Sequence, residues 1–83
     1  MKATPLATRL RRLASFVARH GLTNDDIVDV GVNQAEVHVQ VLAVSIFDRV
    51  VYPVVPTVGF CEGYHRRVAY VDGVRVVCLT RPG

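Results

Sequence analysis

A cysteine and a histidine lie four residues apart in the segment CEGYH, as Cys61 and His65. Both residue types are good zinc ligands, and a cysteine beside a histidine can also act as a nucleophile with its base. Structural zinc sites have closely spaced pairs of ligands, and neither His38 nor Cys78 belongs to a second such pair. The chain also lacks a phosphate-binding glycine loop and the motifs GxSxG and HExxH. We therefore expect no catalytic residue, no metal, no cofactor and no enzymatic activity.

A second candidate site is the C-terminal segment YHRRVAYVDGVRVVCLTR. Its central Asp72-Gly73 pair favours a two-residue hairpin turn, because a type I′ turn needs positive φ at both positions. Pairing the residues on either side of this turn divides the hairpin into two faces. One face is expected to pack on the core and carries Arg67, Ala69, Val71, Val74, Val76 and Cys78. The other face carries Tyr64, Arg66, Val68, Tyr70, Arg75, Val77, Leu79 and Arg81.

This second face suits two kinds of partner. Tyrosine and arginine are common in the centres of protein interfaces. The same residues can stack on bases and contact phosphates. The aliphatic Val68, Val77 and Leu79 among them favour a protein partner. The alternative is a small nucleic-acid-binding module that combines this face with the helix arginines Arg11, Arg12 and Arg19, although charged helix faces are more often simply solvated.

The length and composition of the chain limit the kind of protein that could carry these sites. The chain has 83 residues, enough for a single domain over 1–83, and 51% of them are hydrophobic. This apolar content excludes a disordered tail and favours self-association, with a dimer expected. The net charge is +3, and Lys2 is the only lysine, a bias that GC-rich coding would also produce. No apolar run could span a membrane and no signal peptide is recognisable, so we expect a cytoplasmic protein that does not contact membranes.

The N-terminal third predicts a helix over about residues 5–20. Thr4 can cap its start, with Pro5 at the first helical position, and Gly21 can end it in the left-handed conformation. Leu22 can then fold back on Val17. The predicted apolar stripe consists of Leu6, Leu10, Leu13, Ala14 and Val17.

Alternating residues next predict a hairpin over about residues 27–42. Val37, Val39 and Val41 alternate with polar residues, as in a half-buried strand. The preceding strand is expected to place its valines on one face, with Asp29 on the other. The turn is predicted at Asn33-Gln34.

The segment 43–52 can be interpreted in two ways. Its β-branched residues favour a strand, whereas its periodicity favours a short helix with Ile46, Phe47 and Val50 on one side and Asp48 and Arg49 on the other. We predict a helix over 45–52, ended by Pro53, followed by an extended connector and the hairpin at about 64–81. The expected fold is thus α+β in the order α-β-β-α-β-β. An antiparallel or mixed four-stranded sheet would carry both helices on one face.

The arginine-rich helix, VDV, VHVQV and the later H…VDGVRV hairpin together resemble a group of small uncharacterised proteins of actinobacteria and their phages. The resemblance covers most of the chain and implies a helix from Ala43 to Tyr52. It also implies a small cytoplasmic accessory or regulatory protein, and it carries over no catalytic residue. We expect a non-enzymatic protein that contacts a host protein, a second copy of itself, or both, through a face or an edge of its sheet.

Overall fold

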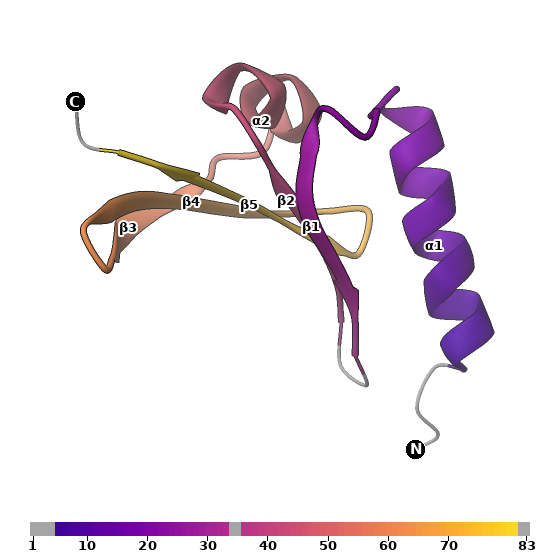
Figure 1. Ribbon diagram of the computed structural model, residues 1–83. Coiled ribbons are helices and arrows are strands. Elements are labelled where there is room, and N and C mark those ends of the chain that lie inside the picture. The colour runs from indigo at the N-terminus through magenta and orange to yellow at the C-terminus, as the bar shows by residue number, and fades with distance from the viewer. Residues whose placement is uncertain (1–4, 34–35, 82–83) are drawn as a thin grey trace.

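The computed structural model describes residues 5–33 and 36–81, which form two helices and one five-stranded sheet (Figure 1). The elements in chain order are α1 (Leu6–Arg19), β1 (Ile27–Val32), β2 (Val37–Val41), α2 (Val44–Val51), β3 (Thr57–Cys61), β4 (Tyr64–Val71) and β5 (Val74–Thr80). The α+β class is confirmed. The predicted four-stranded sheet and the order α-β-β-α-β-β are wrong, because part of the expected connector forms an additional strand, β3.

The strand order across the sheet is β1-β2-β5-β4-β3. Neighbouring strands are antiparallel except β2 and β5, which are parallel, so the sheet is mixed. Figure 1 shows a pronounced twist, with β1 and β2 running across the direction of β3 and β4. The central parallel pair therefore joins the N-terminal hairpin to the C-terminal strands.

The core lies between one face of the sheet and both helices. Phe16 of α1 and Phe47 of α2 are buried in one cluster with alternate residues of the central strands, namely Val37, Val39, Val41, Val74, Val76 and Cys78. Helix α1 contacts β1, β2 and β5, and α2 contacts β2, β4 and β5. Both helices thus cover the same face, as predicted. We call the other side, which neither helix covers, the open face.

Helix α1 ends as its sequence predicts but turns a different side to the core. Gly21 has φ +60°, and the N–H of buried Leu22 donates to the Val17 carbonyl at 3.0 Å, which is the predicted Schellman ending. The predicted apolar stripe is only partly correct. Arg9 and Phe16 are the buried residues of the helix, whereas the N-terminal leucines of that stripe are exposed. The proposed cap Thr4 lies outside the described residues.

The β1–β2 hairpin contains an irregularity that changes the predicted face of β1. Val30 pairs with Val39, but the register shifts between Ile27 and Asp29, so Val28 lies in a β-bulge and is exposed. Val30 is also 43% exposed, so the expected valine face of β1 is only partly covered. The predicted turn residue Gln34 lies outside the described residues. Beside it, the Asn33 N–H donates to the Glu36 carbonyl at 3.0 Å.

Helix α2 confirms the choice of helix over strand for the ambiguous segment. Phe47 and Val50 are buried and Asp48 and Arg49 are exposed, in the predicted periodicity. The helix ends at Val51, before Pro53. Arg49 also donates from Nη1 to the His20 carbonyl at 3.2 Å, which links α2 to the end of α1.

The β4–β5 hairpin has the register predicted from its turn. Asp72 and Gly73 have φ of 50° and 78°, as a type I′ turn requires. Pairing continues from the turn to His65 opposite Thr80 and includes the predicted pair of Arg66 with Leu79. Strand β5 ends at Thr80, so the expected Tyr64–Arg81 pair is not part of the ladder.

Candidate interaction surface

The open face contains all seven strand residues of the predicted interaction surface. Because side chains alternate along a strand, these residues point away from the face that packs on the helices. They are Tyr64, Arg66, Val68 and Tyr70 on β4, and Arg75, Val77 and Leu79 on β5. Arg81, the eighth predicted residue, follows β5 and is exposed. The structure therefore brings the predicted surface together without assigning it a partner.

Aromatic and aliphatic side chains are differently exposed on this face. Tyr70 is 60% exposed and Tyr64 is 37% exposed, whereas Val68, Val77 and Leu79 are half-buried by their neighbours. Val68 and Val77 lie opposite each other on adjacent strands. The result is an aliphatic centre with a tyrosine on each side of it along β4.

A row of polar residues continues the open face onto the N-terminal hairpin. His38 of β2 lies opposite Arg75, which in turn lies opposite Tyr70, so the three residues cross three adjacent strands. The alternation in VHVQV places His38 among the polar positions of its strand but does not join it to this surface. The missing information was the parallel pairing of β2 with β5, which no local pattern reveals.

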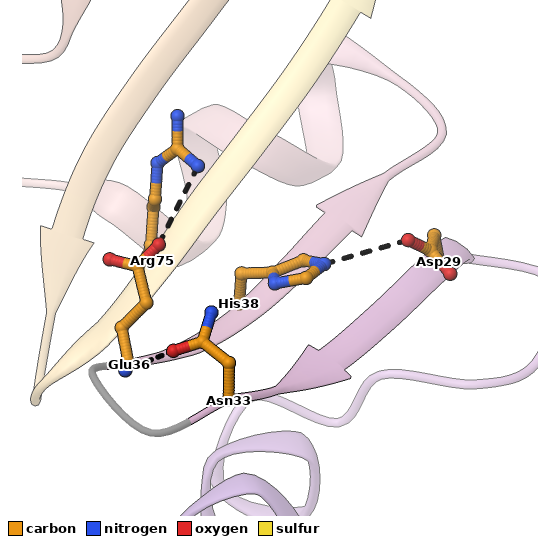
Figure 2. Close-up of polar contacts among 5 residues, drawn as sticks. All are labelled: Asp29, Asn33, Glu36, His38 and Arg75. Carbon is orange, nitrogen blue, oxygen red and sulfur yellow. Dashed lines mark hydrogen bonds and ion pairs between the residues drawn. The ribbon is translucent and has the colours of Figure 1, made fainter.

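Acidic side chains lie beside Arg75 and His38 of this row (Figure 2). Arg75 Nη1 lies 3.7 Å from Glu36 Oε1, and His38 Nε2 lies 3.5 Å from Asp29 Oδ2. The backbone N–H of Glu36 donates to Asn33 Oδ1 at 2.8 Å, which fixes the backbone that carries this acid. These long, partly exposed contacts can orient the side chains, but such contacts at the surface contribute little to stability.

The helix arginines lie on the other side of the sheet, with α1. Arg19 Nη1 is 2.6 Å from Asp72 Oδ2, and the Arg12 side chain lies against Gly73 of the same turn. Arg11 is exposed on the helix. The structure therefore does not combine these arginines with the open face into one continuous surface.

Cys61 and His65 are not brought together either. Phe60 lies opposite His65, and the two rings are 4.4 Å apart between centroids. Residues opposite each other share a face, so Cys61, which follows Phe60, points to the open face while His65 points to the helix side. Cys78 is fully buried, as expected for a core position. Burial raises the pKa of its thiol; the nearby Arg67 opposes this effect, and Asp48 adds to it.

Sequence analysis missed a second surface, at the edge strand β3. All five residues of this strand are exposed. Val58 and Phe60 project on the helix side but are 57% and 70% exposed, because the helices contact β4 and β5 rather than β3. The signal was present in Glu62-Gly63, a two-residue turn with φ of 50° and 82° between two β-rich segments.

Neither a pocket nor a cluster of three metal-ligating side chains is found within residues 5–33 and 36–81. In the same ranges, neither helix is long and apolar enough to cross a membrane. Comparison of the chain with protein-family models, with curated proteins and with solved structures found no match. The candidate sites therefore depend on the geometry of the two exposed surfaces alone.

Proposed function

We propose that the protein is a non-enzymatic accessory or regulatory protein that binds a partner protein through its open face. The observation that carries this proposal is a five-stranded sheet covered by helices on one side only, with tyrosines and half-buried aliphatic residues on the other. A partner would remove the exposed part of Tyr70 and the aliphatic centre around Val77 from water. Such a combination of aromatic anchors and apolar centre is typical of protein-binding sites.

The charges of the open face favour an acidic partner surface. Asp29 and Glu36 already face His38 and Arg75. Among the described residues, Arg66 and Arg81 have no acidic ion-pair partner, and both are exposed. A partner carboxylate beside either arginine would add a charged hydrogen bond without displacing an existing one.

A nucleic-acid partner remains the alternative proposal, and the geometry supports it less. That alternative combines the open face with the helix arginines. The open face and these arginines lie on opposite sides of the sheet. Arg19 is also engaged by Asp72, and Arg12 lies against the neighbouring turn. In addition, the half-buried Val68, Val77 and Leu79 occupy the centre of the face, where phosphates would gain nothing from them.

The test is capture of partners from nuclease-treated extract of the native host by the immobilised protein. Val77→Asp and Tyr70→Glu should each abolish capture of a protein that the wild type retains, because each places a carboxylate in the proposed apolar contact. Ser45→Glu, on the exposed side of α2, is the matched control and should retain it.

Equal capture by wild type and both open-face variants would overturn the proposal. Nucleic acid is tested separately with a mixed-sequence oligonucleotide at low and high salt. Tight low-salt binding that falls steeply with salt and is reduced in Arg66→Ala would support the alternative.

A further inference from the structure

We propose that two copies of the chain associate by antiparallel pairing of their β3 strands, which would join the two sheets into one. This inference is independent of the partner-binding role of the open face. It starts from the two edges of the sheet, β1 and β3, which differ in how well they are protected from pairing with another strand.

The β1 edge is irregular. Its ladder is interrupted by the bulge at Val28, and a bulge is one of the devices that prevent edge-to-edge association. Helix α1 also contacts this strand. An added strand would therefore meet an interrupted hydrogen-bonding pattern at β1.

The β3 edge has none of these features among its five described residues. The strand TVGFC pairs with β4 in regular register, carries no charged residue and is exposed throughout. Pro56 immediately precedes it and cannot donate a backbone hydrogen bond, so pairing is confined to Thr57–Cys61. The exposed backbone donors and acceptors of this strand are suited to one more strand.

A second copy fits this edge because the strand is complementary to itself. A two-fold axis at Gly59 places Val58 of each copy opposite Phe60 of the other, and Thr57 opposite Cys61. Valine opposite an aromatic residue is a favourable cross-strand pair, and no like charges meet. The pairing also requires the same surface patch from each copy, as a two-fold interface does.

The apolar residues around β3 explain what the association would bury. Besides Val58 and Phe60, Tyr52 and Val55 in the segment before the strand are 83% and 88% exposed. Exposed apolar groups in such number mark association sites on small proteins. The two β3 strands alone make a small contact, so a stable dimer would also have to bury apolar residues from the segment that precedes β3.

Static light scattering over a range of protein concentrations tests the association. The wild type should show a dimer mass that dissociates on dilution. Phe60→Glu and Val58→Lys should each raise the dissociation constant by roughly 30-fold or more, because they place charges in the centre of the contact. Both side chains are mostly exposed, so circular dichroism should show that the variants remain folded.

Val77→Asp is the matched control, because it changes the open face and leaves β3 intact. It should retain the dimer while losing the captured partner, which separates a failure of this proposal from a failure of the proposed function. A wild type that remains monomeric up to about 1 mM would overturn the inference. So would a dimer that both β3 variants retain.

The register is tested by Gly59→Cys in a Cys61→Ser background. Opposed residues of paired strands lie within reach of a disulfide or a short bismaleimide cross-linker. Gly59→Cys should therefore give covalent dimers under oxidation or with the cross-linker, and Ser45→Cys in the same background should not. Equal cross-linking at both positions would contradict the predicted axis.

Discussion

The His38 imidazole lies directly over Gly31 on the neighbouring strand. A methyl group built on Gly31 would lie 2.1 Å from His38 Cε1, far too close for two atoms that are not bonded to each other. The glycine therefore makes room for a ring that reaches toward Asp29, with 3.5 Å between His38 Nε2 and Asp29 Oδ2. The position of His38 on the open face thus depends on the lack of a side chain at Gly31.

Gly31→Ala should force the His38 ring away and lower the free energy of unfolding by roughly 1 kcal/mol. In a His38→Ala background the same change should be neutral or slightly stabilising, because alanine restricts the unfolded chain more than glycine does. Urea unfolding of the four proteins in this double-mutant cycle measures the coupling. If Gly31→Ala lowered the free energy of unfolding equally in both backgrounds, contact with His38 would not be the reason that alanine is unfavourable at position 31.

The Arg19–Asp72 pair should contribute little to stability despite its short distance. Both side chains are more than half exposed, so Asp72→Asn should change the unfolding free energy by less than about 0.5 kcal/mol. Asparagine also tolerates the positive φ of this turn position. Asp72→Val should cost roughly 1–3 kcal/mol, because a β-branched residue is strained there. A similar loss in both variants would assign the effect to the ion pair.

A valine-to-alanine change should destabilise the protein more on the core face of β5 than on its open face. Val76 is fully buried, and Val76→Ala should lower the free energy of unfolding by about 2–3 kcal/mol. Its neighbour Val77 is half-buried on the open face, and Val77→Ala should cost less than about 1 kcal/mol. Denaturant midpoints compare the two. A larger cost at Val77 in the dilute monomer would mean that the open face is covered within the chain itself.

The two cysteines should differ in reactivity and in their effect on alkaline stability. Exposed Cys61 should react with a thiol reagent quickly, and buried Cys78 only after unfolding. Since burial raises the Cys78 pKa above its ordinary value of 9.0, the unfolded chain loses this proton first as pH rises. The thiol therefore makes stability fall above about pH 9, by at most about 1.4 kcal/mol per pH unit.

Cys78→Ala isolates this pH effect. The difference in unfolding free energy between wild type and variant should be constant below pH 8 and should shrink between pH 9 and 10 as wild type loses stability. Cys61→Ser serves as the control for labelling and should remove only the fast reaction. A constant difference across the whole pH range would contradict the burial of the thiol.

Local patterns predicted the parts of the fold that local chemistry determines. Asp72-Gly73 defined the β4–β5 register, and the periodicity of Phe47 and Val50 identified α2. Strand β3 was missed because Pro53 and Pro56 made its surroundings resemble a connector. In addition, only Gly59 separates Val58 from Phe60, so the alternation with polar residues is weak.

The remaining differences arise from contacts between distant segments. The burial of Arg9 in place of Leu6 follows from how α1 docks on the sheet, which the helix periodicity alone does not fix. Similarly, the polar row that includes His38 exists only because β2 pairs with β5. The sequence could group the residues of the C-terminal hairpin, but not those that the parallel pairing adds.

That parallel pairing also determines when the molecule can fold. Each pair of opposed residues in β2 and β5, from Val37 with Val74 to Val41 with Cys78, is separated by 37 positions in the chain. Closing so long a loop costs entropy before any contact between β2 and β5 offsets it. The core residues Val74, Val76 and Cys78 can join the cluster only when β5 pairs. On the ribosome, the core can therefore be completed only after β5 has been synthesised. A stop codon shortly before Val74 would leave the edge of β2 that faces β5 without its partner strand.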